Sequence, residues 1–135
     1  ANWSERYISA YATMHPWEDW AETWAHYLHM VDTLETAKSH GLTLKVPGNR
    51  RGRRAKTVAT DDRVFHDYES LSGGWHALTI ALNDLNRSMG LADVYPFVLS
   101  PAVHDKLRFV REVIGRAGSQ GSSSWLGWLR YRRAS

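Results

Sequence analysis

The sequence contains no cysteine among its 135 residues. Disulfide bonds and thiolate metal sites are therefore excluded, and any bound metal must be held by histidine, aspartate or glutamate side chains. Apolar runs are short, since none approaches the roughly 20 residues that a membrane-spanning helix needs. No charged stretch followed by an apolar run opens the chain. The sequence therefore predicts no secretory signal and no transmembrane segment, and it favours a cytoplasmic protein.

Tryptophan, in contrast, is abundant, with seven copies in a chain that is 43% hydrophobic and 23% charged. The length and these fractions are ordinary for one compact globular domain. The chain begins at Ala1 rather than methionine, which leads us to expect a processed product or a fragment of a longer protein. A fragment with this much tryptophan could bury apolar surface by forming a homodimer.

The net charge of +3 is concentrated in two segments. One is the tail "WLGWLRYRRAS", and the other is the loop "PGNRRGRRAKT", which holds Arg50, Arg51, Arg53, Arg54 and Lys56. Basic clusters can bind phosphate groups. A basic run punctuated by glycine and proline is more often a solvated loop, so both interpretations stay open.

Hydrophobic periodicity predicts four helices, over about residues 3–11, 16–39, 72–89 and 101–116. Pro16 and Pro101 suit the first position of a helix, and Ser100 suits the N-cap before it. Gly41 and Gly90 suit the positions just beyond a helix end.

Between residues 42 and 70 the periodicity is lost, although "LTLKV" is compatible with a short strand. The composition of "GRAGSQGSSS" is that of a flexible linker. The sequence therefore predicts a mainly α fold, a compact bundle of about four helices with one long irregular basic loop. Residues 1–116 would form this domain, and residues 117–135 a flexible linker with a tail rich in tryptophan and arginine.

The helix predicted over residues 16–39 carries two stripes of side chains when they are placed at about 100° per residue. The expected core stripe consists of Trp17, Trp20, Ala21, Trp24, Leu28 and Val31. A second stripe falls within an arc of about 80° and consists of Glu18, Glu22, His26 and His29.

Three interpretations of the second stripe fit its spacing. It could be a solvated polar face, in which each Glu–His pair contributes only a few tenths of a kcal/mol. It could be a complete metal site, although side chains from one helix do not easily surround zinc with a tetrahedron of ligands. It could also be part of a metal site whose remaining ligands come from elsewhere.

Two long segments carry a family resemblance: "YISAYATMHPWEDWAETWAHYLHMVDTLETA" and "ALNDLNRSMGLADVYPFVLSPAVHDKLRFVREVI". They resemble the C-terminal half of a bacterial family of zinc-binding metallopeptidases, whose members are similar to the gluzincins. The resemblance covers about residues 3–39 and 75–114.

In gluzincins a helix with the motif HExxH supplies two histidine ligands and the catalytic glutamate, and a later helix supplies a carboxylate ligand. The segment similar to that later helix is "EDWAE". The resemblance therefore implies that Glu18 is the zinc ligand and that Glu22 orients a ligating histidine, or that the two exchange these roles. His26 and His29 could extend this outer set of contacts, stabilise an oxyanion, or be purely structural.

The sequence departs from the family pattern because it contains no HExxH motif. Two of the expected zinc ligands and the general base are missing, so we expect no catalytic residue in this chain and no peptidase activity from it alone. The resemblance implies zinc as cofactor and a peptide or protein as substrate only when the chain is joined to an upstream HExxH segment.

A non-catalytic binding domain is the alternative. The basic loop and the tail would then contact nucleic acid, an acidic protein or a membrane surface. Interleaved aromatic and basic residues are typical of proteins that bind single-stranded nucleic acid, and an amphipathic tail can lie on anionic lipid.

Overall fold

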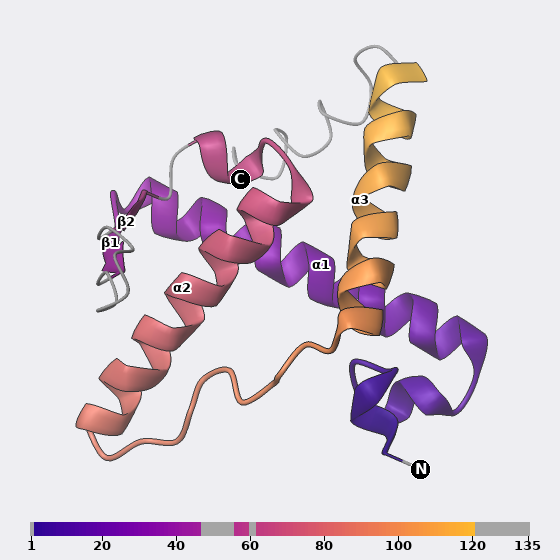
Figure 1. The fold of residues 1–135 in the computed structure, drawn as a ribbon, viewed down its shortest axis with the longest axis horizontal. Helices are drawn as coiled ribbons and strands as arrows, with labels where there is room; N and C mark the ends of the chain where they lie inside the picture. The colour runs from indigo at the N-terminus through magenta and orange to yellow at the C-terminus, as the bar shows by residue number, and fades with distance from the viewer. Residues whose placement is uncertain (1, 47–55, 60–61, 121–135) are drawn as a thin grey trace, which may run out of the picture. The chain divides into compact units, whose positions relative to one another are not determined.

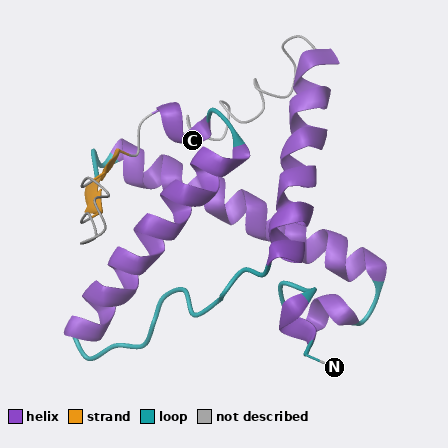
Figure 2. Ribbon diagram, viewed as in Figure 1, coloured by secondary structure: helices purple, strands orange, loops and turns teal. Residues whose placement is uncertain are grey.

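The structure is mainly helical, as predicted. The computed structural model describes residues 2–46, 56–59 and 62–120. Its α-helices are α1 (Pro16–Ser39), α2 (Tyr68–Ser88) and α3 (Pro101–Gln120) (Figure 1). The strands β1 (Thr43–Val46) and β2 (Lys56–Ala59) pair antiparallel, so the short strand predicted at "LTLKV" is confirmed (Figure 2). Short 3-10 helices complete the described elements: η1 (Trp3–Glu5), η2 (Tyr11–Thr13) and η3 (Asp62–Phe65).

The prediction of about four helices is wrong at the N-terminal segment, which forms η1 and η2 rather than an α-helix. Polar side chains bond to the local backbone there. The Ala12 N–H donates to Ser9 Oγ at 3.1 Å, and Thr13 Oγ1 donates to the Ala10 carbonyl at 2.7 Å. Such bonds offer the backbone an alternative to the α-helical ladder.

The predicted helix ends are largely confirmed. α1 begins at Pro16, and Gly41 beyond its end adopts a positive φ of 65°. α2 begins earlier than the predicted residue 72 because Asp67 caps it, accepting the Ser70 N–H at 2.7 Å. This backbone hydrogen bond lowers the pKa of Asp67 to about 2.

The last helix begins at Pro101 as predicted, and the Val103 N–H donates to Ser100 Oγ at 3.3 Å. α3 continues to Gln120, into the segment expected to be a linker. The linker and tail from residue 121 onward lie outside the described residues and stay predictions.

The core stripe of α1 is not the one predicted. Its buried side chains are Thr23, Tyr27, Met30, Leu34 and Ala37. In contrast, Trp17 is 73% exposed and Leu28 is 42% exposed. Both stripes repeat at helical spacing and lie about 100° apart around the axis. Periodicity therefore showed that α1 is a helix but could not identify the buried face.

The chain divides into two compact units, which we call the terminal unit (residues 1–24 and 100–135) and the central unit (residues 25–99). α1 runs from one into the other. In the terminal unit the core is built from the segment before α1, the first turns of α1, and α3, with Ile8, Ala12, Thr23, Val103, Leu107 and Val110 buried.

The central unit packs α2 against the rest of α1 and against η3. Gly74 of α2 lies so close to Val64 that a Cβ there would overlap the valine side chain. Leu34 is next to the same glycine. The absence of a side chain at Gly74 is therefore what lets η3 approach α2. The buried residues of this unit include Tyr27, Met30, Leu34, Val64, Tyr68, Leu71, Trp75 and Leu78.

Within the part of the chain that the structure describes, no helix is both long enough and apolar enough to cross a membrane.

Two leucines on α1 test which of its faces is the core. Leu34→Ala should lower the free energy of unfolding by about 2–5 kcal/mol, because Leu34 is fully buried and its loss leaves a cavity. Leu28→Ala removes the same atoms from an exposed position and should cost less than about 1 kcal/mol. Urea denaturation of both variants measures the difference. Equal losses would contradict the assignment of the core to the Tyr27–Leu34 face.

Candidate functional site

The two candidate metal ligands lie on the first two turns of α1. Glu18 and Glu22 are one helical turn apart, and both are half-buried. The hydroxyl of Ser9 donates a hydrogen bond of 2.9 Å to Glu22 Oε2. Ser9 belongs to the segment that precedes α1, so a second part of the chain fixes the direction of this carboxylate.

Tyr11, from the same segment, lies against the other carboxylate. A side-chain hydrogen bond with Glu18 raises the pKa of Tyr11 above its usual value, and the negative charge of Glu18 adds to this effect. The phenol therefore keeps its proton at neutral pH and can donate it to the carboxylate. Both carboxylates are thus in contact with residues that immediately precede α1.

Lys106 of α3 holds this segment in place. Its Nζ donates to both carboxylate oxygens of Asp19, at 2.6 and 2.8 Å, and to the carbonyl of Arg6 at 2.7 Å. The same ammonium lies 4.4 Å from the ring centroid of Tyr7. A single cation therefore joins α3, the first turn of α1 and the N-terminal segment of the terminal unit.

The tryptophans of α1 are only partly covered. Trp20 packs against Trp24 with ring centroids 5.5 Å apart, and edge-on against Phe109 of α3 at 6.1 Å. Such aromatic pairs contribute roughly 0.5–1.5 kcal/mol beyond the area that they bury. They help to hold α3 on α1 inside the terminal unit, while Trp17 stays exposed.

In the central unit, His26 contacts a tyrosine from the connector after α2. Its Nε2 lies 2.7 Å from the Tyr95 hydroxyl. Burial, together with the charge of nearby His29, lowers the pKa of His26 to about 4. Burial raises the pKa of Tyr95 to about 12. At neutral pH the imidazole is therefore uncharged and the phenol keeps its proton, so the contact is a hydrogen bond between two neutral groups whose direction is set by the imidazole tautomer.

Aromatic rings surround this hydrogen bond. Trp75 packs edge-on against Tyr95 with centroids 5.0 Å apart and against His26 at 6.2 Å. Phe97 also packs against Tyr95, with ring centroids 5.3 Å apart. His26 is thus part of a packed cluster, whereas His29 is exposed.

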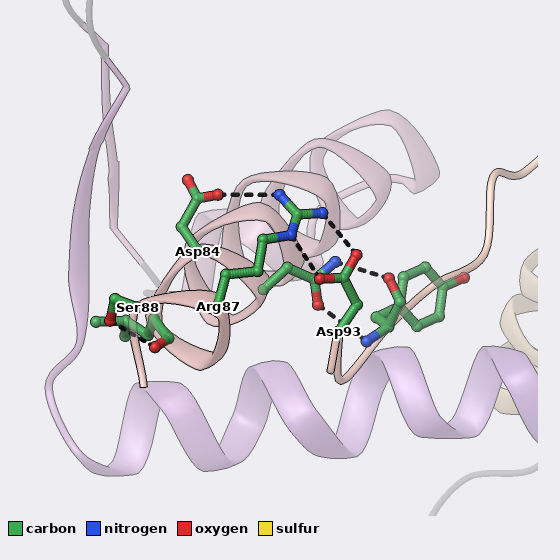
Figure 3. A network of polar contacts seen from close by, with 7 residues as sticks. Asp84, Arg87, Ser88 and Asp93 are labelled. Carbon is green, nitrogen blue, oxygen red and sulfur yellow. Dashed lines mark hydrogen bonds and ion pairs between the residues drawn. The ribbon is translucent and has the colours of Figure 1, made fainter. Parts of the chain in front are cut away.

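The connector that carries Tyr95 is fastened by polar side chains from the end of α2 (Figure 3). Asn83 Nδ2 donates to the Tyr95 carbonyl at 2.8 Å, and Asn83 Oδ1 accepts the Tyr95 N–H at 3.0 Å. Arg87 forms a two-pronged ion pair with Asp93, at 2.7 and 2.6 Å. These contacts fix the tyrosine backbone and therefore the place of its hydroxyl.

Sequence reasoning did not assign Ser9, Tyr11 or Tyr95 to a site. Tyr11 belongs to the apolar spacing that predicted a helix over residues 3–11, and neither Ser9 nor Tyr95 stands in a spacing that is typical of a site. The only local signal was the density of polar residues in "NDLNR" shortly before "ADVY", which is compatible with side chains that fasten a following loop.

Zinc takes four ligands in a tetrahedral structural site, or three protein ligands and a water in a catalytic one. Across residues 2–46, 56–59 and 62–120, no three histidine, aspartate or glutamate side chains come together so as to hold a metal ion. Within these described residues the carboxylate pair therefore does not form a complete zinc site.

Three further histidines do not join the carboxylate pair within the described residues. His66 and His76 are exposed, and His104 is half-buried on α3. The predicted anion-binding residues Arg50, Arg51, Arg53 and Arg54 lie outside the described residues, so phosphate binding there stays a prediction.

Comparison with known proteins identifies the family. A family model with the description "Putative zinc-binding metallo-peptidase" matches residues 1–113. The chain belongs to this metallopeptidase family. The family description implies zinc binding, which agrees with the resemblance carried by the sequence around Glu18.

Three mycobacterial relatives extend the comparison. One uncharacterized protein from Mycobacterium bovis and two from strains of Mycobacterium tuberculosis are each 44% identical to this chain over 115 residues. Each alignment covers 83% of this chain and 30% of the relative, so the chain spans less than a third of the length of these relatives. No solved structure matches the chain.

The lowered pKa of His26 predicts a loss of stability in acid. The unfolded chain binds a proton near the ordinary histidine pKa of about 6.5, whereas the folded chain does so only near pH 4. Stability should therefore fall as the pH is lowered through this window, by up to about 1.4 kcal/mol per pH unit. Urea denaturation across that range measures the slope. His26→Gln should flatten it and His29→Gln should largely keep it, and equal slopes in all three proteins would contradict the assignment.

Proposed function

We propose that this chain is the C-terminal portion of a zinc-dependent metallopeptidase and that Glu18 is one of its zinc ligands. The observation that carries the proposal is the pair Glu18 and Glu22 at the start of α1, in a chain that belongs to a zinc-binding metallopeptidase family. Both carboxylates are half-buried and are contacted by residues of another segment, unlike those of a freely solvated face.

Glu22 has the second task, which is to orient a histidine that binds the metal. One of its oxygens accepts the Ser9 hydroxyl, and no donor among the described residues bonds to the other, which can accept from a second group. The N–H of a ligating imidazole is such a donor, and a carboxylate partner makes the imidazole a better ligand. The reverse assignment, with Glu22 on the metal and Glu18 behind it, uses the same two residues.

The remaining ligands and the general base come from a segment with HExxH, which these 135 residues lack. When bound, zinc supplies a water of lowered pKa and polarises the carbonyl of the bond to be cleaved. The substrate is a peptide or protein, as the family description suggests. The chain alone is inactive, because it provides only part of the site.

Replacing Glu18 separates a ligand from a structural residue. In the intact protein, Glu18→Gln should abolish zinc retention during gel filtration, measured as zinc per chain by atomic absorption. In the 135-residue chain the same change should alter the free energy of unfolding by less than about 1 kcal/mol, because the amide oxygen of glutamine can still accept the Tyr11 hydroxyl. Asp32→Asn, which changes an exposed carboxylate on the same helix, is the matched control.

Glu22→Gln, analysed alongside, assigns the two roles. Complete loss of zinc in only one of the two variants identifies the ligand. If Glu18→Gln instead destabilises the chain by several kcal/mol while the intact protein keeps its zinc, Glu18 is structural and the ligand assignment fails.

A further inference from the structure

We propose that Ser9 and Tyr11 are positioning residues that hold the carboxylates of Glu22 and Glu18 in the orientation that a metal site requires. The proposal rests on the proposed function and extends it to two residues that would not touch the metal. It assigns a task to the N-terminal segment, for which the sequence periodicity predicted only a helix.

The hydroxyl of Ser9 is directed by its own hydrogen bonds. Its oxygen accepts the Ala12 N–H at 3.1 Å, and the oxygen of Glu22 lies 2.9 Å away. A hydroxyl has one hydrogen to donate. Because a lone pair is already engaged by the backbone, the hydrogen is left to point at Glu22. The Ala12 N–H, the Ser9 hydroxyl and one oxygen of the Glu22 carboxylate are therefore joined by two successive hydrogen bonds.

The neighbours of Ser9 and Tyr11 anchor the backbone that carries them. Ile8 and Ala12 are both buried in the core of the terminal unit. The four positions therefore divide, with Ile8 and Ala12 packed inward and Ser9 and Tyr11 against the carboxylates of α1. A shift of this backbone would remove apolar side chains from the core, which holds both polar groups at a fixed distance from α1.

Both ends of the segment are fastened as well. On one side, the Lys106 ammonium donates both to the Arg6 carbonyl and to the carboxylate of Asp19 on α1. On the other side, His15 Nδ1 accepts the Trp17 N–H at 3.1 Å and so caps the start of α1. The segment between Arg6 and His15 is therefore held at two points on the same helix that carries the carboxylates.

Such support matters because a glutamate side chain has several rotatable bonds, and fixing them on metal binding costs conformational entropy. A carboxylate that is already oriented loses less on binding. Removing groups that orient metal ligands typically weakens metal affinity by about 10–100-fold. Ser9 and Tyr11 are expected to orient metal ligands in this way through their hydrogen bonds. Because each acts through a single hydroxyl, the expected loss of affinity lies near the tenfold end of this range.

The test is zinc affinity in the intact protein, measured by competition with a chromogenic chelator near neutral pH. Ser9→Ala and Tyr11→Phe should each weaken zinc binding by about tenfold, and the double variant should weaken it further. Ser9→Thr keeps the hydroxyl and should retain most of the affinity. Ser4→Ala and Tyr7→Phe are matched controls, since the Ser4 hydroxyl bonds to Asn2 and the Tyr7 ring stays available to Lys106.

Thermal unfolding of the zinc-free variants separates positioning from folding. Positioning predicts weaker zinc binding at a temperature where every variant is folded. If Ser9→Ala and Tyr11→Phe lower only the unfolding midpoint and keep the wild-type zinc affinity, while Glu18→Gln loses zinc, the positioning role is overturned and the proposed function stands. If Glu18→Gln and Glu22→Gln both bind zinc like the wild type, the proposed function fails and this inference fails with it.

Discussion

The ion pair between Lys106 and Asp19 is the interaction on which the candidate site depends. It joins α3 to the first turn of α1, and the same ammonium binds the Arg6 carbonyl and faces the Tyr7 ring. Since both partners are largely shielded from solvent, the pair is screened less than a surface salt bridge. It fixes the N-terminal segment beside α1, and that segment brings Ser9 to Glu22 and Tyr11 to Glu18.

The surface of α1 has three faces with different roles. One face, centred on Tyr27 and Leu34, is the core. A second carries the carboxylates, and a third carries Trp17 and Leu28, which the described residues leave exposed. Contiguous apolar surface that the rest of the described chain leaves exposed often marks a surface on which another segment or partner packs. It agrees with the proposal that this chain works as one portion of a longer metallopeptidase.

The sequence could predict those features of the fold that local residue chemistry determines, such as the helix ends. Pro16 and Pro101 mark the starts of their helices, and Gly41 lies just beyond the end of α1 in the positive-φ conformation that favours glycine. The core of α1 could not be predicted, because two stripes share the helical period and only tertiary packing chooses between them. The partners of the carboxylates could not be predicted either, since they depend on how the preceding segment folds back. The prediction that Glu18 is a zinc ligand came only from the family resemblance.

The carboxylate pair also gives the long polar face of α1 a physical explanation. Its first half offers two oriented carboxylates, while His26 further along is neutral and engaged with Tyr95. A helix that bound zinc by itself would need at least one more ligand at the same place, and none of the described residues provides it. The proposed zinc site must therefore be divided between this chain and another segment.

Calorimetric titration of zinc into the 135-residue chain and into the intact protein, side by side near neutral pH, tests that requirement most directly. The account predicts tight binding of one zinc by the intact protein and weak or no binding by the chain alone. Tight stoichiometric binding by the chain alone, lost in Glu18→Gln or Glu22→Gln, would show that these residues belong to a complete local site and would contradict the divided site.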